Sequence, residues 1–257
     1  MKAGIVILDN ASKPESSRKW LEGYLKSIGV EVSSYLLKLG DIDYLKEIFS
    51  QNDALIIVGA AGEKSVVGKV AELLNLGVEV NGEALEMIRS YYSDQIDLPE
   101  HVEEKAMMPE FSFVVPNERG PVPGFVAFSL TNDKFIAATP ARFEEAVECF
   151  ETGIQDFFRA KTGKKYSVTF TLYLDGSIEE AENMVRKLET QAENTFIRLD
   201  ARFLGREGVP IVLTVYAATP EELSDTMAKL EDYSHRLAQE MGKKLIEKTQ
   251  PEQEEEF

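Results

Sequence analysis

Short apolar runs alternate with helical patterns of apolar residues through the first half of the chain. Residues 3–8 and 54–59 consist of apolar residues and glycine, which is typical of strands buried on both faces of a parallel sheet. Leu21, Leu25 and Ile28 instead recur at the three- and four-residue intervals of a helix that buries one face. This alternation predicts an α/β fold, a doubly wound domain with three layers.

The same patterns predict the remaining elements of this domain. Further strands are expected at 30–37, 111–115, 125–130 and 135–139, and further helices at 45–49, 66–74 and 81–108. The sequence Thr-Asn-Asp-Lys at 131–134 indicates a hairpin turn between the last two strands. Thr139 as the N-cap and Pro140 at the first helical position then predict a long helix that runs to about residue 158.

A short polar segment at 160–165 predicts a boundary between a domain at 1–162 and a second domain at 163–250. The second domain is expected to contain, in order, a strand at 167–174, a helix at 177–191, a strand at 195–203, a turn at 204–208, a strand at 209–216 and a helix at 219–246. This βαββα order predicts a small α+β domain with its helices on one face of the sheet. The last residues, 251–257, are acidic and are predicted to form a disordered tail.

The charge balance narrows the classes of partner. The 45 acidic and 28 basic residues give a net charge of −17, which disfavours binding to nucleic acid or to an anionic membrane. The single cysteine, Cys149, excludes an internal disulfide and a thiolate metal cluster, and the two histidines, His101 and His235, exclude a histidine-rich metal site. With no signal peptide and no apolar run of about 18 residues, we expect a soluble cytoplasmic protein.

Several stretches resemble the N-terminal domain of the CinA family. The family has a proline–acid pair, an apolar strand, Pro-Asn and then Gly-x-x-Pro-Gly-Phe, and 108–117 and 120–125 have the same types of residue at the same spacing. Residues 55–62 lie where the family has Thr-Gly-Gly-Leu-Gly, and 139–145 lie where it has Leu-Pro-Gly-x-Pro-x-Glu-Met. The resemblance implies a molybdopterin-binding (molybdenum-cofactor biosynthesis) fold and a KH-like second domain, without the family's deamidase domain.

The departures from the family pattern concern its chemistry. After Gly-Leu-Gly the family has Pro-Thr-x-Asp-Asp, and those acids hold a divalent metal or activate water on a pyrophosphate. Here 63–67 is Glu-Lys-Ser-Val-Val, and valine cannot bind a hard cation such as Mg²⁺. The first loop, 9–17, is shorter than in the family, and the turn after residue 139 lacks a glycine and a proline.

In a fold of this kind a ligand lies beyond the carboxyl ends of the strands, where loops 9–17, 59–65, 117–124 and 139–142 should meet. Each loop carries one basic residue (Lys13, Lys64, Arg119 and Arg142), although Asp9, Glu15, Glu63 and Glu118 are interleaved with them. The predicted ligand-binding residues are Asp9, Asn10, Gly59, Gly62, Glu63, Lys64, Ser65, Asn117, Gly120, Gly124, Thr139 and Arg142. The alternative is that the charges are ordinary exposed loop charges and that Gly120 and Gly124 shape a tight turn.

Three functions remain open at this level. The first is binding of a small anionic ligand, a nucleotide, ADP-ribose or a pterin, with little or no catalysis. The second is a metal-dependent ADP-ribose pyrophosphatase, a hydrolase in which Glu63, Asp9 or Glu15 replaces the lost acids; this function alone would need a divalent metal. The third is a non-catalytic scaffold that forms a dimer or a trimer. No catalytic residue and no certain cofactor are assigned.

Other notable residues have structural interpretations. Gly205-Arg-Glu-Gly208 has the letters of a KH-domain GxxG loop, which normally joins two helices and clamps a nucleic-acid backbone. Because it lies between two expected strands, it is interpreted as a hairpin turn. Cys149, Trp20 and Phe143 are expected to belong to the core.

Overall fold

The structure is a computed structural model that describes residues 1–94, 98–199 and 208–246. Contacts within the chain divide it into two compact units, Met1–Thr162 and Gly163–Phe257. The predicted acidic tail lies outside the described residues, as do the end of the strand expected at 195–203 and most of the turn expected at 204–208.

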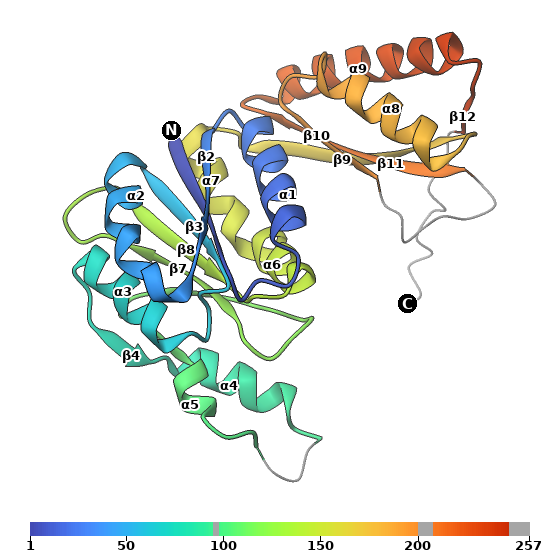
Figure 1. Ribbon diagram of the computed structural model, residues 1–257. Coiled ribbons are helices and arrows are strands. Elements are labelled where there is room, and N and C mark those ends of the chain that lie inside the picture. Colours follow the sequence, from blue (N-terminus) through green and yellow to red (C-terminus); the bar gives the residue numbers. More distant parts are fainter. Residues whose placement is uncertain (95–97, 200–207, 247–257) are drawn as a thin grey trace, which may run out of the picture. The chain divides into compact units, whose positions relative to one another are not determined.

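The first unit is built on a mixed sheet. In the described residues this sheet has six strands in the order β2-β1-β3-β8-β7-β6 (Figure 1). The strands are β1 (Lys2–Leu8), β2 (Glu31–Leu37), β3 (Ala54–Val58), β6 (Phe113–Val115), β7 (Gly124–Phe128) and β8 (Phe135–Thr139). Strands β2, β1, β3 and β8 run parallel, and β7 and β6 are antiparallel to their neighbours. The predicted hairpin between β7 and β8 is confirmed.

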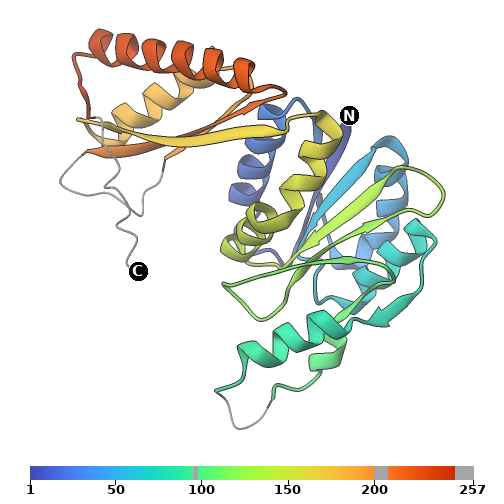
Figure 2. The same ribbon diagram turned by 180° about the vertical axis from the view of Figure 1, so that it is seen from behind.

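Helices lie on both faces of this sheet, which confirms the predicted three-layer α/β fold (Figures 1 and 2). One face carries α1 (Pro14–Ser27), α6 (Phe143–Cys149), a π-helical turn (Phe150–Ile154) and α7 (Gln155–Thr162). The other face carries a 3-10 turn (Leu39–Tyr44), α2 (Leu45–Gln51) and α3 (Lys64–Leu74). The central strands are therefore buried on both sides, as their apolar sequences require.

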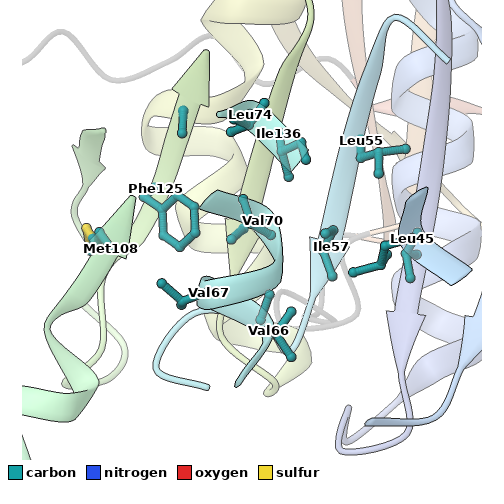
Figure 3. Close-up of a cluster of buried hydrophobic side chains, with 14 of the residues drawn as sticks. Leu45, Leu55, Ile57, Val66, Val67, Val70, Leu74, Met108, Phe125 and Ile136 are labelled. Carbon is teal, nitrogen blue, oxygen red and sulfur yellow. The ribbon is translucent and has the colours of Figure 1, made fainter. Parts of the chain in front are cut away.

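The two faces of the sheet have cores of different character. On the α3 face, Val66 and Val70 pack with Ile57 and Phe125 in a largely aliphatic cluster (Figure 3). On the opposite face the core is aromatic, and the ring of Phe158 lies 5.0 Å from that of Phe135. Alternate side chains along β3 point to opposite faces, so each strand contributes to both cores.

The prediction of one long helix at 81–108 is wrong. The structure has α4 (Gly82–Tyr91), a short α5 (Val102–Lys105), and a two-stranded antiparallel sheet of β4 (Val78–Val80) and β5 (Met107–Pro109). His101, at the N-cap of α5, has a φ of 62°. A left-handed residue interrupts a helix, so the polar stretch breaks into separate pieces. The strand expected to start at residue 111 starts at Phe113, because Phe111 has a φ of 60°.

Thr139 is not the N-cap of the helix that follows it, which corrects the prediction from the Thr-Pro pair. It is the fully buried last residue of β8, and the helix begins at Phe143 with Arg142 as N-cap. The carbonyl of Thr139 accepts hydrogen bonds from the amides of Gly59 and Ala61. These bonds hold Thr139 in the sheet, so the chain turns only after Pro140.

The second unit is a four-stranded antiparallel sheet in the described residues, in the order β10-β11-β9-β12. Its elements are β9 (Tyr166–Leu174), α8 (Ile178–Glu189), β10 (Thr195–Leu199), β11 (Val209–Ala217), α9 (Pro220–Glu240) and β12 (Leu245–Ile246). Both helices contribute to one core with the sheet, through Met184 and Leu188 from α8 and Leu230 and Leu237 from α9. The predicted α+β class is confirmed.

The helix expected at 219–246 is shorter than predicted. Helix α9 stops at Glu240, and Gly242 has a φ of 67°, which ends the helix. Leu245 and Ile246 then pair with β9 as a further strand. No helix within 1–94, 98–199 and 208–246 has both the length and the apolar character needed to cross a membrane.

Candidate functional site

The structure brings the four predicted loops together at one edge of the main sheet. Strands β1, β3 and β8 end at this edge and the antiparallel β7 begins there. Backbone hydrogen bonds join the loops: the amides of Gly59 and Ala61 donate to the Thr139 carbonyl at 3.0 and 3.1 Å, and the amide of Ser12 donates to the Ala141 carbonyl at 2.9 Å. The loops therefore form one connected surface.

The topological switch point of the sheet is occupied by a side chain of the protein itself. The strand order reverses between β1 and β3, which is where an open α/β sheet normally receives a ligand. Asn10 follows β1, and its Nδ2 donates to the carbonyl of Gly59 at 3.0 Å. A Cβ at Gly59, whose φ is 92°, would overlap the Oδ1 of Asn10. That oxygen is buried and has no hydrogen-bond partner among the described residues.

Two more of the predicted site glycines are explained by close packing within the chain. Gly62 has a φ of 80°, and a Cβ there would lie 3.1 Å from the Cγ1 of Val122, a buried residue. A Cβ at Gly124 would lie 2.9 Å from the carbonyl oxygen of Ala138 and 3.2 Å from the Sγ of Cys149. These positions exclude side chains because the protein itself fills the space beside them.

Glu145 is a buried carboxylate beneath the 117–122 loop, and the sequence analysis did not select it. It is 5% exposed, and its Oε2 accepts a hydrogen bond from Asn117 Nδ2 at 3.0 Å. Asn117 Nδ2 also donates to the Val122 carbonyl at 2.9 Å, and the guanidinium of Arg142 lies 3.4 Å from Glu145 Oε1. A Cβ at Gly120 would overlap this carboxylate. Asn117 and Gly120 therefore build the loop around Glu145.

The basic residue that each of the four loops contributes is paired with a glutamate. The ion pairs are Lys13–Glu144, Lys64–Glu104 (3.6 Å), Arg119–Glu148 (2.8 Å) and Arg142–Glu145 (3.4 Å). Three of these glutamates lie on α6. The hydrogen bond from Lys13 holds the pKa of Glu144 below its ordinary value, so the carboxylate stays charged. Pairing of this kind lowers the net positive charge that the loops offer to an anion.

The acids predicted to hold a metal in place of the family's aspartates have other partners or positions. Asp9 Oδ1 accepts the amide of Leu39 at 3.1 Å. Glu15 is hydrogen-bonded to Arg18, which lowers the pKa of Glu15. Glu63 is the N-cap of α3. Within the described part of the chain, no three acidic, histidine or cysteine side chains are arranged to hold a metal ion.

The two valines at the family's aspartate positions belong to the core. Val66 and Val67 are both 0% exposed, and their side chains point from α3 toward the sheet, beside Ile57 and Phe125 (Figure 3). A carboxylate at either position would be buried among apolar side chains without a partner, which is energetically costly. Positions 66 and 67 therefore favour apolar side chains in this structure.

Only part of the predicted site remains open to solvent. Lys64 and Ser65 are exposed at the start of α3, where Glu63 is the N-cap and no described side chain caps the helix. The hydroxyl of Thr139 is buried and donates to the carbonyl of Pro140 at 3.2 Å. The amides at the start of α3 are thus polar groups of this site that suit an anion.

The residues predicted to be core have different environments. Cys149 is fully buried, which confirms its assignment, and burial raises the pKa of its thiol to about 12. Trp20 is partly buried and packs edge-on against Phe150 at 5.5 Å. Phe143 is also partly buried, with Lys13 Nζ 5.6 Å from its ring centroid. Because its pKa is raised, the Cys149 thiol is neutral and unreactive at ordinary pH.

We expect Asn117→Ala to lower the free energy of unfolding by ~1–3 kcal/mol, because it leaves the buried Glu145 carboxylate and the Val122 carbonyl without their donor. Urea denaturation measures this change. The control is Glu118→Ala at the neighbouring exposed position, which should alter stability by less than about 0.5 kcal/mol. Equal stability of the two variants would show that the Asn117 contacts do not hold the loop.

No protein-family model matches the sequence, and the curated proteins give no match either. Among solved structures, a CinA protein of unknown function from Thermoplasma acidophilum is similar, with a TM-score of 0.50 and 16% identity over 61% of this chain and 99% of that chain. MogA gives a TM-score of 0.36 with 13% identity, over 63% of this chain and 99% of that chain. The molybdopterin biosynthesis enzyme MoaB from Thermus thermophilus gives a TM-score of 0.33 with 14% identity, over 63% of this chain and 97% of that chain. The chain thus contains a domain with the fold of CinA, as the sequence motifs implied.

Proposed function

We propose that this protein is a non-catalytic, CinA-like scaffold that associates with further copies of itself. The main observation that supports the absence of catalysis is at the topological switch point between β1 and β3. There the side chain of Asn10 lies over Gly59 and donates a hydrogen bond to its carbonyl. A ligand that bound there in the usual way would have to displace this side chain. The paired loop cations support the same conclusion, because the loops offer little net positive charge.

The buried valines of α3 support the loss of hydrolysis. Cleavage of a pyrophosphate depends on a cation that neutralises charge on the phosphoryl oxygens, or on a base that activates water. Val66 and Val67 are buried where the family carries aspartates, and the described acids of the loops are not arranged to hold a metal in their place. The scaffold therefore keeps the fold without the groups that the reaction needs.

The edge of the main sheet supports self-association. Strand β6 is the last strand of the sheet, and two aromatic side chains are exposed at its start: Phe111 is 77% exposed and Phe113 is 56% exposed. The ring of Phe113 lies 5.3 Å from Phe157 and 6.1 Å from Phe128, so the patch continues over partly buried rings. An exposed edge strand with apolar side chains favours pairing with another strand.

A second copy of the chain suits this edge. Two β6 strands can pair antiparallel about a two-fold axis, which places aromatic side chains of one copy against those of the other. The net charge of −17 on each copy opposes the approach over long distances. Because salt screens this repulsion, the proposed association strengthens as ionic strength rises.

To test the absence of catalysis, we expect no conversion of ADP-ribose to AMP and ribose 5-phosphate with Mg²⁺, Mn²⁺ or Co²⁺, measured by chromatographic separation of the products. Val66→Asp/Val67→Asp should also be inactive and should lose about 3–5 kcal/mol of stability or more, because both carboxylates would be buried. Val66→Ala/Val67→Ala controls for the loss of apolar volume. Metal-dependent turnover that Glu63→Gln abolishes would contradict the proposal and support a pyrophosphatase with relocated acids.

For the association, sedimentation velocity should show a dimer or larger species whose fraction rises with salt. Phe111→Ser/Phe113→Ser should shift the protein toward the monomer, because it removes the apolar edge. Leu36→Ser on the opposite edge strand β2, where Leu36 is 70% exposed, is the matched control and should leave the distribution unchanged. Pairing through β6 would be refuted if the protein were a monomer at every concentration and salt level. It would also be refuted if the substitutions on β2 and at β6 shifted the distribution equally.

A second candidate function, binding of a nucleotide, ADP-ribose or a pterin, is favoured by the start of α3. No described side chain caps this helix, Lys64 and Ser65 are exposed, and the nearby Oδ1 of Asn10 lacks a partner among the described residues. If the site binds such an anion, these ligands should raise the melting temperature, and Lys64→Gln should reduce the rise. No stabilisation by any of the three ligand classes would remove this candidate.

A further inference from the structure

The second unit contains a cavity lined by its own residues. It has a volume of about 440 Å³ and lies between the segment that follows α8 and one side of α9. The cavity is lined by Gln191, Ala192, Glu193, Asn194, Thr195, Glu222, Thr226, Lys229, Leu230, Tyr233 and Arg236. Protein pockets that bind small molecules have volumes of roughly 300–1,000 Å³. This cavity is therefore large enough for a ligand of modest size.

One wall of the cavity is a polar stripe on α9. Thr226, Lys229, Tyr233 and Arg236 recur at intervals of three and four residues, which places them on the same side of the helix. Between Lys229 and Arg236 the helix advances by roughly 10 Å, since each residue adds about 1.5 Å. Tyr233 lies between these two cations, so the wall presents an aromatic ring flanked by positive charges.

The opposite wall is held in place by backbone contacts. Asn194 has a φ of 54°, and its carbonyl accepts the amide of Tyr216 in β11 at 2.8 Å. The amides of Gln191 and Ala192 donate to the carbonyl of Leu188 at the end of α8. The segment is therefore anchored at both ends, and it places the amide side chains of Gln191 and Asn194 on the wall facing α9.

The charges of the lining residues are unevenly compensated. Glu222 uses both oxygens, accepting from Lys164 Nζ at 3.3 Å and from the amide of Ala218 at 2.8 Å, and the bond from the amide lowers its pKa. Arg236 pairs with Asp232 at 3.0 Å. Lys229 is exposed and forms no ion pair with any described residue. Its ammonium group is the uncompensated cation of this wall.

We propose that this cavity binds a nucleoside monophosphate, with the phosphate at Lys229 and Arg236 and the base against Tyr233. An ammonium and a guanidinium are the side chains that bind phosphate most readily. Tyrosine rings stack on bases. The size of the cavity fits a single nucleotide, and the amides on the opposite wall can bond to its polar edges.

The remaining acid of the cavity favours guanine among the bases. Glu193 lines the same space, and a carboxylate accepts hydrogen bonds but donates none when it is ionised. Guanine carries two adjacent N–H donors on its Watson–Crick edge, whereas adenine has a donor next to an acceptor. A carboxylate therefore pairs with guanine at two points and with adenine at one, so GMP should bind more tightly than AMP.

Isothermal titration of the full chain with GMP, AMP, guanosine and inorganic phosphate tests this proposal. We expect saturable binding of GMP, weaker binding of AMP, and still weaker binding of guanosine and of phosphate alone. Lys229→Gln should weaken GMP binding about tenfold or more, because it removes the uncompensated cation from the phosphate. Glu193→Gln should reduce the preference for GMP over AMP.

A matched control shows whether GMP binding depends on this cavity. Lys187→Gln removes the same charge from an exposed position on α8 outside the cavity and should bind GMP like the unaltered protein. Absence of GMP binding at millimolar concentration, equal weakening by Lys187→Gln, or unchanged GMP binding in Lys229→Gln would each overturn the proposal.

Discussion

The contact between Asn117 and the buried Glu145 carboxylate organises the end of the first unit's sheet. It joins the loop before β7 to the beginning of α6, and Gly120 leaves the space that the carboxylate fills. The same asparagine holds the carbonyl of Val122, whose side chain packs against Gly62 after β3. The contact between Asn117 and Glu145 thus joins the loop before β7 to α6 and, through Val122, to the loop after β3.

The helix that supplies Glu145 also determines the charge of the site. Glu144, Glu145 and Glu148 of α6 neutralise cations from three different loops. Each exposed pair contributes little to stability, but together they remove positive charge where an anionic ligand would need it. A protein with net charge −17 has few places that attract an anion. Among the site loops, the start of α3 is the place where these three ion pairs alter the local charge least.

The sequence predicted the parts of the fold that depend on neighbouring residues. The apolar strands, the hairpin before β8 and the CinA-like motif at 108–125 were all visible as local patterns. It could not show that Thr139 stays in the sheet, because the amides that hold it come from Gly59 and Ala61, far away in the sequence. The glutamate partners of Lys13, Lys64 and Arg119 were missed for the same reason. Glu145 is only three residues from Arg142 and stands at the glutamate of the family motif, so the sequence could have indicated it.

The burial of Val66 and Val67 has a consequence for the substitutions that the chain tolerates. At a surface position an aspartate can be introduced at little cost to folding. At positions 66 and 67 an acid would place a charge in the aliphatic core between α3 and the sheet, and it would have to be accompanied by repacking around Ile57 and Phe125. Selection for a folded protein therefore acts against acidic residues at these two positions.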